Sequence, residues 1–187
     1  MIARLWQKMM RRLARAHVQR RMVRATHPPG ELAGRVARAQ AILFICTGNI
    51  IRSAFAAELL RSRSVGRADL RIRSAGLNAT TGGPAHPTAV QCARRFGVDL
   101  SRHRTHRLEP IDIEGADVLL AMELDHVVEI TRRFPQHRQK VFLFSCLADE
   151  AQDVADPVYA PNDVFEACFE RIDHVVRRIV KMPPLTS

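Results

Sequence analysis

Short apolar runs recur along the chain at intervals that suit the strands of one sheet. The run AILFIC (41–46) is apolar throughout, as a strand buried on both faces of a parallel sheet is. DLRIRSAG (69–76) alternates with period two and stops at a glycine, as a strand entering a loop does. ADVLLAM (116–122) and VFLF (141–144) have the apolar character of two further strands. We therefore predict four strands.

Helical spacing of apolar residues fills the intervals between these runs. It predicts helices over residues 53–64, 87–96, 123–134 and 161–181. Gly97 follows the second of these, where helices often end. The last helix carries one apolar stripe: Phe165, Cys168, Phe169, Ile172, Val175 and Ile179. Strands that alternate with helices imply βαβ units, so the predicted fold class is α/β with a parallel sheet covered on both faces.

The first 40 residues have a different pattern. Arginines separate apolar residues that recur at steps of three and four, namely Ile2, Leu5, Trp6, Met9 and Leu13. This is typical of a basic amphipathic helix. The segment HPPGELAG (27–34) is predicted to break it, because proline lacks an N–H group. We expect a basic amphipathic or disordered N-terminal extension over residues 1–40 and a folded domain over 41–187.

Composition narrows the class of protein. A chain of 187 residues with 47% hydrophobic and 26% charged residues suits one globular domain. No apolar run approaches the roughly 18 to 20 residues of a membrane-spanning helix, and no signal-peptide core is visible. The four cysteines are widely spaced and form no metal-binding cluster: Cys46, Cys92, Cys146 and Cys168. We expect free thiols and a cytoplasmic location.

The net charge of +10 is concentrated at one end. Residues 1–40 hold ten Lys and Arg against one acid, whereas the remainder holds 19 bases and 18 acids. Such a segment suits an anionic membrane surface or an acidic partner, which would make the protein membrane-peripheral. Nucleic acid is disfavoured, because no base-reading motif accompanies the charge. A solvated tail, a helix docked on the domain, a targeting peptide and an upstream extension removed by a start at Met22 remain alternatives.

The stretch ICTGNIIRS (45–53) carries the candidate chemistry. Cys46 ends a predicted strand, and in an open parallel sheet ligands bind where strands lead into helices. The N–H groups of the loop and the positive end of the next helix favour an anion there, either a thiolate or a phosphate. Arg52 adds a planar fork suited to two phosphate oxygens. An ordinary buried thiol is the alternative for an isolated cysteine.

Three smaller residues of the stretch fit the same role. Gly48 permits a ligand to approach the backbone closely, and Asn49 is a residue type that tolerates left-handed geometry. Ser53 stands at the predicted helix start, where its hydroxyl can donate to the sulfur or cap the helix.

The stretch resembles the phosphate-binding loop of the low-molecular-weight protein tyrosine phosphatases. These proteins have a flavodoxin-like three-layer αβα fold with a four-stranded parallel sheet. The resemblance runs from residue 41 to about residue 181, through the pieces RSAG (73–76), GVDLSRHR (97–104), LLAME (119–123) and ADPVY (155–159).

The resemblance implies hydrolysis of phosphotyrosine and aryl phosphates through a phosphocysteine intermediate. Cys46 would be the nucleophile, Arg52 would hold the phosphoryl oxygens, and Asp156 would be the general acid and then the base. No metal or cofactor is required. A phosphotyrosine-bearing protein and a bacterial-type tyrosine kinase would be the partners. The rest of the phosphate-binding loop would be Thr47, Gly48, Asn49, Ile50, Ile51 and Ser53.

The resemblance also implies residues that support the site. Ser74 would bond to Asn49, and His103 would contact it as well, unless His103 is a surface residue. Tyr159 would wall the pocket by stacking on a substrate ring, or would pack within its own loop.

Departures from the family pattern bear on redox behaviour and substrate. Ile51 stands where many members have a second cysteine, so oxidation of Cys46 should be harder to reverse. Cys92 lacks the nearby partner that an arsenate reductase needs, and Ile50 replaces the threonine of arginine phosphatases. A module that binds phosphate without turnover remains the competing class. Asp156 separates the two, because a binder needs no acid.

Overall fold

A computed structural model describes residues 29–64, 67, 69–148 and 152–182. The basic helix predicted from residue 2 lies outside them. The elements, in chain order, are α2 (Pro29–Arg38), β1 (Ala41–Cys46), α3 (Arg52–Arg63), β2 (Arg71–Gly76), α4 (Pro87–Arg94), α5 (Pro110–Glu114), β3 (Val118–Ala121), α6 (Leu124–Arg133), the 3-10 helix η1 (Pro135–Lys140), β4 (Val141–Leu143), the 3-10 helix η2 (Phe144–Ala148) and α7 (Asn162–Val180).

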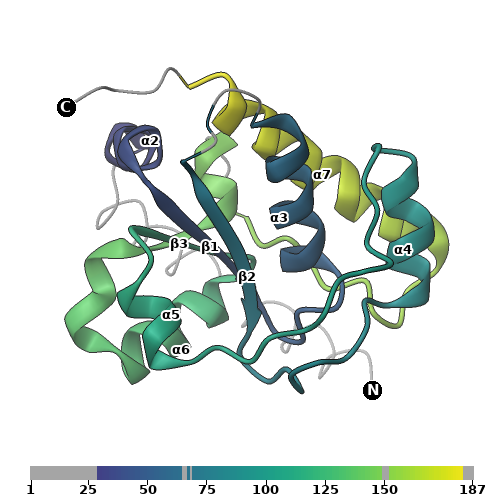
Figure 1. The fold of residues 1–187 in the computed structure, drawn as a ribbon, viewed down its shortest axis with the longest axis horizontal. Helices are drawn as coiled ribbons and strands as arrows, with labels where there is room; N and C mark the ends of the chain where they lie inside the picture. The colour runs from purple at the N-terminus through teal and green to yellow at the C-terminus, as the bar shows by residue number, and fades with distance from the viewer. Residues whose placement is uncertain (1–28, 65–66, 68, 149–151, 183–187) are drawn as a thin grey trace, which may run out of the picture.

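The four predicted strands form one parallel sheet in the order β2-β1-β3-β4 (Figure 1). Cys46 pairs in register with Gly76 on one side, while Ile45 pairs with Ala121 on the other. From β1 the chain passes first to β2 and later crosses to β3 on the opposite side. The strand order therefore reverses at β1, and in such sheets ligands bind outside the carboxyl ends at this reversal.

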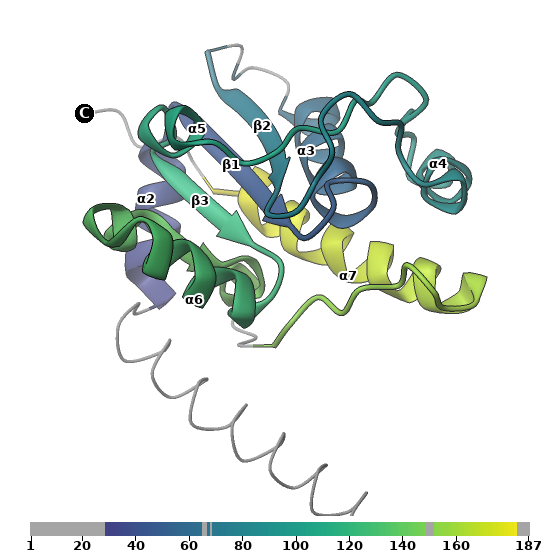
Figure 2. The same cartoon turned by 90° about the horizontal axis from the view of Figure 1, so that it is seen from below.

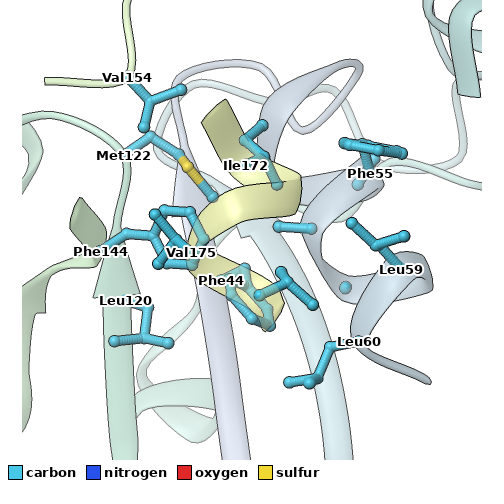
Figure 3. Close-up of a cluster of buried hydrophobic side chains, with 14 of the residues drawn as sticks. Phe44, Phe55, Leu59, Leu60, Leu120, Met122, Phe144, Val154, Ile172 and Val175 are labelled. Carbon is cyan, nitrogen blue, oxygen red and sulfur yellow. The ribbon is translucent and has the colours of Figure 1, made fainter. Parts of the chain in front are cut away.

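Helices cover both faces of the sheet, which confirms the three-layer α/β prediction. Figures 1 and 2 show α3 and α7 on one side of the sheet and α5 and α6 on the other. Side chains of β1 alternate between the two layers: Phe44 belongs to the core under α3 and α7, whereas Ile45 belongs to the core under α6. Figure 3 shows side chains of the first core, in which Phe44 from β1 lies beside Val175 from α7, and Phe55 from α3 belongs to the same cluster.

The long helices lie close to their predicted ranges, and the apolar stripe of α7 is buried along its whole length. Gly97 has φ of +73°, a left-handed value, just after α4 as expected. Within the described residues, no helix is long and apolar enough to cross a membrane.

The segment predicted to break the N-terminal helix contains the start of another helix, and the residues before it lie outside the described part of the chain. Pro29 opens α2, a position where its missing N–H costs nothing. Leu32 and Val36 are 1% and 0% exposed and belong to the core that η2 and α7 line. Residues 29–38 therefore dock on the domain as a helix, and this part of the predicted extension is neither separate nor disordered. The division of the chain near residue 40 otherwise stays a prediction.

Candidate active site

The loop after β1 has a shape that depends on two backbone features. Asn49 has φ of 56°, in the left-handed region that asparagine tolerates. Gly76, at the end of β2, lies directly beneath the loop. A Cβ atom on Gly76 would lie 2.7 Å from the carbonyl oxygen of Thr47 and 2.9 Å from the nitrogen of Asn49. The loop can therefore rest on the sheet only because this position has no side chain.

The sulfur of Cys46 lies inside this loop and is almost fully buried. The backbone N–H group of Asn49 donates to Sγ at 3.2 Å, and Ser53 Oγ lies 3.0 Å from Sγ. Ser53 lies in the first turn of α3, so its hydroxyl approaches the sulfur from the N-terminal end of a helix, whereas the Asn49 N–H belongs to the preceding loop. A backbone N–H group and the N-terminal end of a helix are thus directed at one sulfur.

Asn49 connects the loop to the neighbouring chain segments. Its Nδ2 donates to the hydroxyls of Ser53 and Ser74, each at 2.9 Å. Its Oδ1 accepts the backbone N–H of His106 at 2.8 Å, and His103 Nε2 lies 2.7 Å from its backbone carbonyl oxygen. The contacts that the resemblance implied for Ser74 and His103 are thus present. The polar groups of Asn49 are satisfied by protein atoms alone, so the loop is formed before any ligand arrives.

Burial lowers the pKa of His103, although its bond to the Asn49 carbonyl opposes this change. The ring is therefore neutral at neutral pH. Its Nε2 must hold the proton, because only a donor can bond a carbonyl oxygen.

Arg52 begins α3 and is 1% exposed. Its Nη1 donates to the carboxylate of Glu123 and, at 2.8 Å, to the carbonyl oxygen of Val154. Its Nη2 donates to Asp156 Oδ2 at 2.5 Å. Burial would lower the pKa of Arg52, but the charges of Cys46, Glu123 and Asp156 outweigh burial and raise it above the ordinary value. Arg52 is therefore a fixed cation between two carboxylates.

One donor of Arg52 has no partner among the described residues. This donor is Nε, which is buried and makes no hydrogen bond to them. A buried donor left unpaired is costly unless a ligand supplies an acceptor. The orphaned donor belongs to a side chain that lines the same cavity as Cys46.

The cavity measures about 140 Å³. It brings together three residues that the sequence placed at the site: Cys46, Arg52 and Asp156. Tyr159 does not line it and is 98% exposed, while Val158 does line it. The complete lining is Cys46, Thr47, Gly48, Ile50, Ile51, Arg52, Asp156 and Val158.

Asp156 reaches the cavity because the segment before it is held against the end of β3. The Val154 N–H donates to the carbonyl oxygen of Met122 at 2.8 Å, and Val154 itself is fully buried. Asp153 Oδ1 accepts the N–H of Leu124, also at 2.8 Å. Two anchors on the β3–α6 turn thus precede a carboxylate whose side chain is 34% exposed, which leaves Asp156 open to solvent.

Sequence reasoning missed two residues of the site, Glu123 and His126. Glu123 pairs with Arg52, and His126 bonds to Thr47 in the loop. The sequence did carry one signal, because Glu123 followed three residues later by a polar side chain at a helix start has the spacing of a capping box. That spacing predicts a helix cap and says nothing of Arg52. In the part of the chain that the structure describes, no three His, Cys, Asp or Glu residues gather as metal ligands do.

Residues 41–182 of the chain are similar in sequence to known phosphatases. A family model described as low molecular weight phosphotyrosine protein phosphatase matches residues 41–182. The low molecular weight protein-tyrosine-phosphatase Etp of Escherichia coli K12 is 32% identical over 140 residues, which is 75% of this chain and 92% of Etp. A protein-arginine-phosphatase of Geobacillus stearothermophilus is also 32% identical, over 141 residues, which is 75% of this chain and 93% of that protein.

Solved structures of phosphatases are also similar to this chain. The YwlE arginine phosphatase of Geobacillus stearothermophilus superposes with a TM-score of 0.71 at 31% identity, covering 75% of this chain and 90% of YwlE. The tyrosine phosphatase Wzb of Escherichia coli K30, solved in complex with sulphate, gives 0.71 at 30% identity, covering 76% and 97%. The sequence relatives therefore match this chain over nearly their whole length, and the family match leaves out residues 1–40.

Proposed function

This chain belongs to the low-molecular-weight phosphotyrosine protein phosphatase family, a family of phosphoric monoester hydrolases, and we propose that it removes the phosphoryl group from phosphotyrosine in proteins. The observation that carries the proposal is one cavity lined by a buried thiol, a buried arginine with an unpaired donor, and a solvent-accessible carboxyl group. The first two bind and attack a phosphoryl group. A module that only binds phosphate would not need the third.

In the first step, the sulfur of Cys46 attacks phosphorus. An S–P bond forms, the P–O bond to the tyrosine oxygen breaks, and the carboxyl group of Asp156 gives its proton to the leaving phenolate. Arg52 and the loop N–H groups hold the equatorial oxygens, on which charge is spread during transfer.

In the second step, water attacks the phosphocysteine. Asp156, now a carboxylate, takes a proton from that water, the S–P bond breaks, and inorganic phosphate leaves. The sulfur of Cys46 is the leaving group of this step and is free to attack again. Each step uses groups of this chain alone.

The lining of the cavity supports an aromatic substrate. Ile50 and Ile51 of the loop, together with Val158, form an apolar wall of the cavity, which suits a phenyl ring. Relatives of this chain include both tyrosine and arginine phosphatases, so the wall is what favours phosphotyrosine here. The partners would accordingly be proteins phosphorylated by a tyrosine kinase of the bacterial type.

Hydrolysis of p-nitrophenyl phosphate tests the proposal. We expect turnover by the protein and none by Cys46→Ser. Phosphate binding by both forms, without turnover by either, would identify a binding module instead. Asp156→Asn should retain phosphate affinity and lose kcat, with the larger loss for aryl phosphates that have poor leaving groups. Asp163→Asn, at an exposed position of α7, is the matched control and should leave kcat unchanged.

A peptide pair tests the substrate class. We expect faster release of phosphate from a phosphotyrosine peptide than from a phosphoarginine peptide of the same sequence. Ile50→Thr should lower the ratio of the phosphotyrosine rate to the phosphoarginine rate, because it removes part of the apolar wall. A preference for phosphoarginine in the unaltered protein would reject phosphotyrosine while leaving the phosphatase activity standing.

A further inference from the structure

His126 joins the phosphate-binding loop to the turn that holds Arg52. It lies in the first turn of α6 and is 5% exposed. Its Nδ1 accepts the backbone N–H of Glu123 at 3.2 Å, and its Nε2 lies 3.0 Å from Thr47 Oγ1. One buried ring therefore contacts both the loop and the residue that pairs with Arg52.

These two contacts fix the position of the ring's proton. Because Nδ1 accepts a backbone N–H, the neutral ring must hold its proton on Nε2. Nε2 then donates to Thr47 Oγ1, which acts as the acceptor in that bond. The proton of the Thr47 hydroxyl is consequently directed away from His126. Thr47 is exposed and lines the cavity beside Cys46 and Arg52, so an anion bound there can replace solvent as the acceptor of this proton.

We propose that neutral His126 is a positioning residue that turns the Thr47 hydroxyl proton toward the bound phosphoryl group, where it adds one side-chain donor to those of Arg52 and the loop. The proposal rests on the phosphatase function and deepens it. His126 touches neither the substrate nor the sulfur in this arrangement and acts through Thr47.

The charged groups around His126 are Glu123, Arg52, Asp153 and Asp156. Burial lowers the pKa of His126 below its ordinary value near 6.5, with Glu123 opposing the change and Arg52 adding to it. The neutral ring is thus present at neutral pH. When the ring protonates at lower pH, Nδ1 becomes a donor and loses its bond with the Glu123 N–H, while Nε2 can still donate to Thr47. The bond to Glu123 that fixes the orientation of the ring therefore holds above the lowered pKa of His126 and is lost as the pH falls through it.

A double-mutant cycle on the hydrolysis of p-nitrophenyl phosphate tests the bond. Thr47→Val removes the hydroxyl, and His126→Gln removes the ring while retaining a residue that completes a capping box. We expect each change to lower kcat/KM about tenfold. The double variant should lose little more than either single one, because both changes remove the same bond. Independent losses that multiply to about a hundredfold would overturn the proposal.

The pH profile separates positioning from a structural role. The acid limb of kcat/KM that belongs to His126 should be absent from His126→Gln, and the urea midpoint of that variant should stay near that of the unaltered protein. His174→Gln, on the exposed face of α7, is the control and should leave both the rate and the profile unchanged. An identical acid limb in His126→Gln would reject the assignment.

Two measurements need no turnover. Nitrogen-15 NMR of the imidazole at pH 7 should show a protonated Nε2 and an unprotonated Nδ1, and the opposite tautomer would overturn the proposal. In the Cys46→Ser background, Thr47→Val should weaken the affinity for inorganic phosphate about tenfold. Unchanged affinity would also overturn it. If the unaltered protein proved inactive, the phosphatase function would fail while these two results would still decide the role of His126.

Discussion

Gly76 ends β2 at the point where the loop after β1 passes closest to the sheet. Gly76→Ala would place a methyl group within 2.7 Å of the Thr47 carbonyl oxygen, and backbone atoms cannot move aside as a flexible side chain can. We expect a loss of about 1 to 3 kcal/mol in the free energy of unfolding, as in other overpacked sites. The activity should fall further than the stability, because the displaced atoms belong to the phosphate-binding loop. Urea unfolding and p-nitrophenyl phosphate turnover measure the two effects.

Gly30→Ala is the matched control for that change. A Cβ atom at Gly30, in α2, meets nothing within 4 Å. Alanine is also the better helix former by up to about 1 kcal/mol. Gly30→Ala should therefore be neutral or slightly stabilising, with unchanged turnover. Equal behaviour of the two variants would show that the loop does not depend on the missing side chain of Gly76.

Ile51 precedes Arg52 in the loop, and we expect it to limit how Cys46 recovers from oxidant. Ile51 is 2% exposed and packs in the core, and none of the four cysteines, which all lie within the described residues, forms a disulfide. Peroxide converts a thiolate to a sulfenic acid and then to a sulfinic acid, and a nearby thiol can intercept the first product. We expect peroxide-treated protein to regain little activity with dithiothreitol. Ile51→Cys should regain more, through a disulfide between Cys46 and the introduced thiol that mass spectrometry can detect.

One outcome of the peroxide experiment would contradict this prediction. Full recovery of the unaltered protein after excess peroxide would show that Cys92, Cys146 or Cys168 reaches Cys46. Burial raises the pKa of Cys168 to about 12, which keeps that thiol protonated and a poor partner for rapid interception.

At the residue scale, the sequence predicted the groups of the short loop and missed those that reach it from far along the chain. Cys46 and Arg52 were predictable because a local stretch of chain sets their spacing. The bond from Arg52 to Glu123 spans 71 residues, and that from Thr47 to His126 spans 79, so no local pattern reveals either. Tyr159 is the opposite case, since its proximity to Asp156 in sequence did not bring its ring to the cavity.

At the scale of elements, α2 is expected to stabilise the domain although it precedes the family match. Leu32→Ala should cost about 2 to 4 kcal/mol of unfolding free energy, the usual range for a buried leucine. Arg38→Ala, on the exposed side of the same helix, should cost far less. Likewise, a protein that begins at residue 41 should have a lower midpoint urea concentration of unfolding than one that begins at residue 29. Equal midpoints would show that α2 contributes no stability.

The strands were easier to predict than the short helices. A strand covered on both faces must be apolar throughout, and β1 and β3 have this property in full. α5 has only five residues, too few to show a helical period. α2 was not predicted, because proline disfavours the interior of a helix yet suits its first position. The sequence alone does not show which of these two positions Pro29 occupies.

At the scale of the whole molecule, most of the positive charge and the candidate site lie in different parts of the sequence. Residues 1–28 hold eight Lys and Arg and no acid, which is most of the net charge of +10. We predict that the full chain sediments with vesicles of anionic lipid and that salt weakens the binding, since each basic residue near such a surface contributes about 1 kcal/mol. The chain that begins at residue 29 keeps α2 and is the control. Equal sedimentation of the two would exclude a role for this segment.

The two carboxylates that pair with Arg52 are expected to couple substrate binding to proton binding. Before substrate arrives, one guanidinium already faces Glu123 and Asp156, in addition to the sulfur of Cys46. A phosphoryl dianion that enters must displace Asp156 from Arg52, and Asp156 must gain a proton before it can act as an acid. Substrate association should therefore be coupled to proton uptake from the buffer. Calorimetric heats of binding would then vary with the ionisation enthalpy of the buffer chosen, and affinity for the dianion would strengthen as the solution becomes more acidic.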